Sequence, residues 1–248
     1  MKLRLALVLF VFSLFCPRAE SLDQTLPLRI VTEHLAPFHY LNQEQKVVGL
    51  LSNRLLPILQ NLEPGLKIEL LPWSHAYELA TRRPNTLLFS VIRTPERESK
   101  FVWLSRLLEV NTILIANSDS NVEPTDNLAD LMQYNLGVKK NDAITDHLLK
   151  VGFEFDNNLM EIVQSESTIT MLRRQRFDLI PTNVYILEDY CKKNDCELDE
   201  FKVIYTFDEI PQTFFLVINK DSDPVLIKLL RQELASFAPL TLNNRELE

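Results

Sequence analysis

The segment TLLFSVIRTPER, residues 86–97, contains a nearly unbroken apolar run over residues 86–92. A short apolar run of this kind predicts a β-strand that is buried on both faces, as strands of a helix-covered parallel sheet are. A Thr-Pro-Glu-Arg element, Thr94 to Arg97, follows the run directly. The segment therefore predicts a central strand whose carboxyl end carries an arginine.

Shorter strand patterns and longer helical patterns alternate on both sides of this segment. Strands are predicted at residues 28–31, 67–71, 136–138, 162–163, 179–180, 203–207 and 214–218. Helices are predicted at residues 51–62, 74–80 with Ser74 as cap, 128–134, 142–150, 167–176, 184–192 and from Asp223-Pro224 onward. This alternation indicates an α/β fold with a parallel or mixed sheet.

Composition excludes several function classes. The 248 residues include only four glycines, Gly49, Gly65, Gly137 and Gly152, and no two lie close enough to form a phosphate-binding or dinucleotide-binding loop. P-loop ATPases, kinases and Rossmann oxidoreductases are therefore excluded. The hydrophobic share of 46% also excludes a disordered chain.

The amino-terminal residues 1–21 read as a secretory signal. Lys2 and Arg4 precede the apolar run 5–15, which is shorter than the roughly 20 residues that span a bilayer. We expect cleavage after Ser21, with Ala19 as the alternative site, and the other reading is an uncleaved membrane anchor. Phe15 before Cys16 makes a poor lipoprotein site. The segment predicts an exported, periplasmic protein.

Cleavage would also change the charge balance. Residues 1–21 carry three basic and one acidic side chain, so their removal shifts the formal net charge from −8 to −10. Such an acidic chain repels nucleic acid and anionic lipid. Two cysteines remain, Cys191 and Cys196, and an oxidising compartment favours a disulfide between them. Neither has a His or a further Cys nearby in sequence, which argues against a metal site.

The order of these elements resembles the bacterial family 3 solute-binding proteins, the polar amino-acid type that serves ABC transporters. The resemblance covers essentially the whole mature chain. It is carried by Ala36-Pro37-Phe38-His39-Tyr40 with Gly49, by Pro72-Trp73, by Thr94 to Arg97 with Phe101, by Gly137 to Asp142, and by Phe177-Asp178-Leu179-Ile180 leading to Asn183.

The resemblance implies a type II periplasmic-binding fold of two α/β lobes joined by a two-segment hinge. The first lobe is expected to comprise residues 22–113 and 214–248, and the second residues 114–213. A small polar, carboxylate-bearing solute is expected in the cleft between them. The expected partner is a membrane permease, the chain is expected to be a monomer, and no cofactor is implied.

Residue roles follow from the same resemblance. Arg97 matches the arginine that grips the ligand carboxylate, with two parallel donors suited to that group. Trp73 matches an aromatic platform, and Ser90 a polar contact near the arginine. The remaining expected ligand-binding residues lie on loops around the cleft: Glu33, Phe38, Tyr40, Asn141, Asp142 and Asn183.

Two positions depart from the amino-acid binders. Asn183 stands where an Asp usually pairs with the α-ammonium of the ligand, and an amide offers no counter-charge. Asn141-Asp142 replaces the Gly-Thr that usually opens the helix of the second lobe. Asp142 can cap that helix, but its charge repels a carboxylate. The resemblance thus implies solute capture without implying an amino acid.

Three other readings stay open. Glu33, His34, His39 and His75 could gather around a metal, although their spacing matches no standard ligand pattern. Glu33 could serve as a general base in an enzyme similar to the periplasmic dehydratases of this fold, although the chain has no Gly-x-Ser-x-Gly nucleophile motif. The loaded protein could also dock on a membrane receptor rather than on a permease. We expect a binding protein and not an enzyme.

Overall fold

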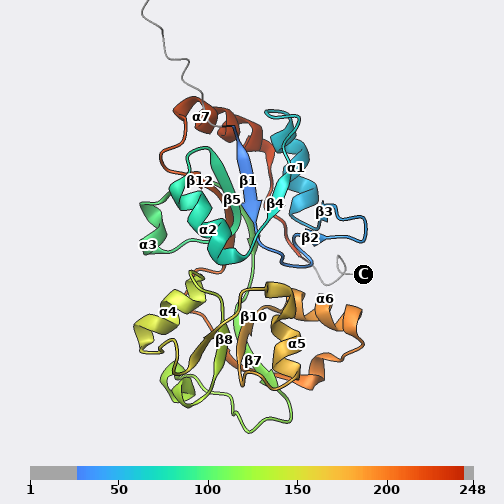
Figure 1. The fold of residues 1–248 in the computed structure, drawn as a ribbon, viewed down its shortest axis with the longest axis vertical. Helices are drawn as coiled ribbons and strands as arrows, with labels where there is room; N and C mark the ends of the chain where they lie inside the picture. Colours follow the sequence, from blue (N-terminus) through green and yellow to red (C-terminus); the bar gives the residue numbers. More distant parts are fainter. Residues whose placement is uncertain (1–26, 243–248) are drawn as a thin grey trace, which may run out of the picture.

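The computed structural model describes residues 27–242 and shows two α/β lobes, one above the other in Figure 1. The predicted signal segment, residues 1–21, lies outside the described residues. No helix within the described range is long and apolar enough to cross a bilayer.

The first lobe is built on a five-stranded mixed sheet. Its strand order is β4 (Ile68–Leu70), β1 (Arg29–Thr32), β5 (Thr86–Ile92), β12 (Thr213–Asn219) and β6 (Phe101–Glu109). The first three strands are parallel, and β12 runs antiparallel to both of its neighbours. All seven residues of β5 are buried, as its apolar run predicts.

The first lobe also contains helices and a hairpin. The helices are α1 (Ser52–Gln60), α2 (Trp73–Arg82), the short α3 (Pro95–Glu98) and α7 (Pro224–Glu233), followed by the 3-10 turn η4 (Leu234–Ser236). Strands β2 (Tyr40–Leu41) and β3 (Val47–Val48) form the hairpin. Pro57 lies within α1, and the Asp223 side chain caps α7 by accepting from the Val225 N–H, as predicted.

The second lobe contains two small sheets. Strands β10 (Ile180–Thr182), β7 (Ile113–Asn117) and β11 (Phe201–Thr206) are antiparallel, whereas β8 (Leu136–Val138) and β9 (Leu159–Glu161) are parallel. Helices α4 (Ala143–Val151), α5 (Thr168–Arg173) and α6 (Val184–Asn194) surround them. The 3-10 turns are η1 (Leu128–Gln133), η2 (Ser165–Ser167) and η3 (Leu198–Glu200).

The chain passes between the lobes twice. It leaves the first sheet after β6 and enters the second lobe at β7, and it returns between β11 and β12. Residues 110–112 and 207–212 lie between these strands and connect the two lobes.

Several local predictions were wrong. Ser74 does not cap α2, because the helix begins at Trp73 after Pro72 and has no side-chain cap. The strand predicted at residues 162–163 lies at 159–161, and Val163 is exposed. The helix predicted at residues 128–134 is a 3-10 helix capped by Asn127.

Cys191 and Cys196 do form the disulfide that the sequence favours.

Candidate functional site

A cavity of about 580 Å³ lies between the lobes. This volume is in the range of small-molecule sites. The first lobe lines it with the loop after β1, the β2–β3 hairpin, the start of α2 and the end of β5. The second lobe lines it with residues around β8, α4, α5 and α6.

Most of the site residues predicted from the sequence meet at this cavity. Those that line it are Glu33, Tyr40, Trp73, Ser90, Arg97, Asp142 and Asn183. Phe38 does not, and its expected place in the cleft wall was wrong. Its side chain is fully buried in the core, edge-on to Phe214 and Tyr185, because the loop turns it away from the cleft.

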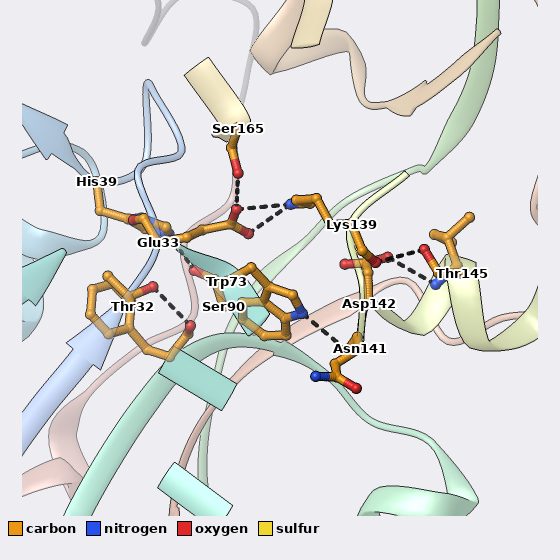
Figure 2. A network of polar contacts seen from close by, with 12 residues as sticks. Thr32, Glu33, His39, Trp73, Ser90, Lys139, Asn141, Asp142, Thr145 and Ser165 are labelled. Atoms are coloured by element: carbon orange, nitrogen blue, oxygen red, sulfur yellow. Dashed lines mark hydrogen bonds and ion pairs between the residues drawn. The ribbon is translucent and has the colours of Figure 1, made fainter. Parts of the chain in front are cut away.

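Asn141 contributes its backbone rather than its side chain. The residue has a left-handed backbone, φ +62°, and its carbonyl faces the first lobe. That oxygen accepts hydrogen bonds from Trp73 Nε1 at 3.0 Å and from Arg97 Nη2 at 2.8 Å. Figure 2 shows the contact between Trp73 and Asn141. A single carbonyl of the second lobe thus engages two predicted ligand residues of the first.

Arg97 is buried, with 1% of its surface exposed. Its Nη1 donates to the Ile92 carbonyl at 3.0 Å, and the rings of Trp73 and Tyr77 flank the guanidinium. Its Nε–H is buried and has no hydrogen-bond partner among the described residues. A buried donor without an acceptor is costly, so this atom marks a place where an additional acceptor would stabilise the site.

An acidic side chain of the second lobe also approaches Arg97. Asp146 Oδ2 lies 3.7 Å from Arg97 Nη2. Burial raises the pKa of Asp146, and the nearby charge of Asp142 adds to this, while Arg97 opposes both. The guanidinium of Arg97 therefore has only a long ion pair with this carboxylate.

Glu33 and Lys139 form an ion pair across the cleft. Lys139 Nζ lies 2.8 Å and 2.9 Å from the two oxygens of the Glu33 carboxylate, and Ser165 Oγ donates to the same carboxylate (Figure 2). Burial acts to lower the pKa of Lys139, but the charges of Glu33 and Asp142 outweigh it and leave that pKa raised. Lys139 is therefore a charged ammonium on the cavity wall.

Sequence reasoning missed Lys139. The available signal was its position directly after the buried strand at residues 136–138, where side chains of α/β folds face ligands. Its partner Glu33 lies 106 residues earlier in the chain, so no local pattern could pair them.

His39 and Ser90 form a buried polar pair in the first lobe. His39 Nδ1 lies 2.6 Å from the Glu33 carbonyl, and Nε2 lies 2.8 Å from Ser90 Oγ. Burial lowers the pKa of His39 to about 3, so the ring is neutral. Because a carbonyl only accepts, Nδ1 carries the proton and Nε2 accepts from the Ser90 hydroxyl. Ser90, at φ +63°, then offers the cavity an acceptor.

Two helices of the second lobe begin at the cavity. Asp142 caps α4 by accepting from the Ile144 N–H at 2.9 Å, and Asn183 caps α6 by accepting from the Ile186 N–H at 3.1 Å. Because capping uses the oxygen of the Asn183 amide, its NH₂ group remains available as a donor. Asn183 is itself 97% buried, so this donor is held in place.

The rim is closed by α6. Lys193 Nζ lies over the Tyr40 ring, 4.5 Å from its centroid, and 2.8 Å from Asp189 Oδ2. Much of the remaining wall is aliphatic, with Leu35, Ile92, Val138, Ile144, Ile162, Ile169 and Ile186. Within residues 27–242 no three His, Cys, Asp or Glu side chains are grouped as a metal site would need.

Comparison with known proteins establishes the fold. No family model matches the chain, and no curated protein sequence matches it. The arginine-bound form of truncated ArgBP from T. maritima is similar in structure, with 14% identity, a TM-score of 0.69 and coverage of 85% of this chain and 96% of that one. These values place the chain in the two-lobed periplasmic-binding fold.

Two further solved structures are similar over the same extent. The arginine-, lysine-, histidine-binding protein ArtJ from Geobacillus stearothermophilus shares 17% identity, with a TM-score of 0.67 and coverage of 84% of this chain and 88% of that one. A histidine kinase sensor domain with similarity to periplasmic binding proteins shares 15% sequence identity, with a TM-score of 0.68 and coverage of 86% of this chain and 90% of that one.

Proposed function

We propose that this protein captures a small, carboxylate-bearing solute between its lobes and presents the loaded form to a membrane permease of the ABC type. The observation that carries the proposal is Arg97, which lines the interlobe cavity and whose buried Nε–H lacks an acceptor among the described residues. A carboxylate oxygen would supply that acceptor, and the hydrogen bond would be charge-assisted. The two-lobed fold and its amino-acid-binding neighbours support the same role.

Closure of the lobes would hold the solute in the cavity. Trp73, Arg97 and Ser90 belong to the first lobe, and Asn183 and Asp142 belong to the second, so a solute between them contacts both lobes. Closing the cleft excludes water, which strengthens the contact between Arg97 and a carboxylate. A membrane partner can then select the closed form by its shape.

The proposed site of action is the periplasm. Residues 1–21 would direct export to the periplasm, where the Cys191–Cys196 disulfide is stable, and the protein would act as a monomer. We propose binding without turnover, because Glu33, the candidate general base, is held by Lys139 and Ser165, and burial leaves His39 a weak base with a pKa of about 3.

A thermal-shift screen of paired acids and amides tests the proposal. A solute at 100 times its Kd stabilises the folded state by about 2.7 kcal/mol, which raises the Tm by roughly 5–10 °C for a chain of this size. We expect at least one acid to do so and its amide to have little effect. If no acid in a broad panel shifts the Tm, the proposal is wrong.

The role of Arg97 is tested by the ratio of acid to amide affinity. Loss of one charge-assisted hydrogen bond should reduce that ratio roughly 10- to 100-fold in Arg97→Gln. The ratio is informative even if the variant binds both compounds less well, because only a contact to the carboxylate distinguishes them. Arg106→Gln is the matched control, since Arg106 is exposed and pairs with Glu109 on the surface.

A sensory role is the second candidate. It is favoured by the similarity to a histidine kinase sensor domain. Uptake of the labelled solute in a strain that lacks this protein separates the two roles. Transport predicts that uptake falls, whereas signalling predicts that uptake is unchanged and that only the response to the solute is lost.

A further inference from the structure

The protein's own donors already occupy the buried carboxylate of the cavity. Both oxygens of Glu33 contact Lys139 Nζ, at 2.8 Å and 2.9 Å, and Ser165 donates a third hydrogen bond (Figure 2). Only 4% of the Glu33 surface is exposed. Lys139 thus holds the position that the ammonium group of a ligand would take beside this acid.

Three other acceptor side chains of the cavity wall also have partners within the protein. Asp189 is paired with Lys193 at 2.8 Å. Asp142 accepts from the Ile144 N–H, and its charge acts on Lys139. The Asn183 oxygen accepts from the Ile186 N–H. Ser90 Oγ remains as a neutral acceptor for a solute, and it suits a hydroxyl group better than an ammonium.

We propose that the solute is a monocarboxylate with an apolar body and no α-ammonium, because Lys139 of the second lobe takes the place of that ammonium against Glu33. This inference rests on the proposed capture of a carboxylate at Arg97. It makes Lys139 the residue that sets the preference between a simple carboxylate and an amino acid.

The wall of the cavity fits an apolar body. Ile92, Ile144, Ile162, Ile169 and Ile186 line it from both lobes, and Trp73 and Phe214 add aromatic surface. Contacts of this kind favour branched or aromatic carbon skeletons through burial of apolar area. A volume of about 580 Å³ accommodates either.

An α-ammonium would be unfavourable in such a cavity. It loses its hydration on entry and finds Glu33 already paired, since displacing Lys139 from Glu33 leaves the lysine unpaired instead. The absence of a charge-assisted partner corresponds to roughly 10- to 100-fold in affinity. We therefore expect amino acids to bind more weakly than their des-amino analogues by that factor.

Two matched pairs of probes test this by isothermal titration calorimetry at pH 7. They are 4-methylpentanoate with leucine, and 3-phenylpropanoate with phenylalanine, and each pair differs only in the α-ammonium. We expect the des-amino member of at least one pair to bind at least tenfold more tightly. Equal or tighter binding of the amino acid overturns the inference but leaves carboxylate capture standing. Binding of none of the four overturns the proposed solute class, while the acid–amide screen still tests capture itself.

Lys139→Met then tests the assigned residue. Removing the ammonium frees Glu33 for the ligand, so the preference for the des-amino compound should fall at least tenfold or reverse. Lys220→Met is the control, because Lys220 is an exposed lysine paired with Asp221. An unchanged preference in a folded Lys139→Met variant overturns the role of Lys139.

The double variant Glu33→Gln/Lys139→Met covers the case in which an unpaired buried Glu33 prevents folding. It removes both charges together, which is less disruptive than removing one. We expect it to keep the preference for the des-amino compound, since no carboxylate is released. A gain of amino-acid binding in this double variant would also contradict the inference.

Discussion

Replacing Gly49 by Ala should destabilise the protein by at least about 3 kcal/mol. Gly49 has φ +132°, and a Cβ atom there would lie 2.4 Å from the Phe38 oxygen and 2.5 Å from the Phe38 carbonyl carbon. A left-handed backbone alone costs a non-glycine residue about 1–2 kcal/mol. The collision adds to this, because the Phe38 carbonyl accepts from the N–H groups of Leu51 and Ser52 and is held in place.

Gly65→Ala is the matched control. The nearest atom to a Cβ at Gly65 is Glu63 Oε1 at 4.0 Å, so nothing has to move. Alanine also reduces the freedom of the unfolded chain, and we expect Gly65→Ala to be neutral or to stabilise by about 0.4–1 kcal/mol.

Urea unfolding followed by circular dichroism gives both free energies of unfolding. The reasoning is refuted if Gly49→Ala is within about 1 kcal/mol of the natural protein, or if the two alanine variants lose similar stability. Because Gly49 contacts the loop that carries Glu33, His39 and Tyr40, a folded Gly49→Ala variant should also bind solute more weakly.

Three further predictions concern the interior and the lobe contacts. The free energy of unfolding should fall by about 2 kcal/mol between pH 7 and pH 5, because the unfolded chain protonates His39 near pH 6.5 while burial holds its folded pKa at about 3. His39→Gln should flatten that part of the stability profile. His75→Gln, at an exposed position, should leave it unchanged. Replacing Cys191 and Cys196 together by Ser should cost about 2 kcal/mol in chemical unfolding, since the bond closes a short loop, and reductant should then have no additional effect. Asn141→Gly should keep solute affinity within about twofold, because the contact is a backbone carbonyl and glycine tolerates φ +62°. Trp73→Phe should weaken solute affinity roughly fivefold, because the hydrogen bond to that carbonyl is lost. A larger loss in Asn141→Gly than in Trp73→Phe, measured by titration calorimetry, would show that the Asn141 side chain matters more.

Local signals in the sequence were sufficient for the central elements. The apolar run at residues 86–92 predicts β5, and Asp142 and Asp223 are found as the helix caps that their positions indicate. Strand β6, Phe101–Glu109, was not predicted. Its burial does not alternate, and its pairing with β12 contains register shifts, so it lacks the period-two pattern of a regular edge strand.

Part of the cavity lining was predicted from the resemblance to a known family. That resemblance placed Trp73, Ser90 and Arg97 at the cleft, and all three line the cavity. Asn141 was also expected at the cleft, but the role of its backbone carbonyl could not be predicted, because every residue has a carbonyl and its direction depends on the fold. Phe38 was misassigned because an aromatic residue on a cleft loop can turn either way, and only tertiary packing decides it.

The strand order of the first sheet has a consequence for the biogenesis of the protein. Strands β5 and β6 do not pair with each other, and both pair with β12, which is made about a hundred residues after them. A chain emerging from a ribosome or a translocation channel can complete the second lobe while two apolar strand edges of the first remain open. Such edges invite aggregation, so we expect truncation before residue 213 to yield insoluble or chaperone-bound chains. The nascent protein acquires its cleft only when its last strand arrives.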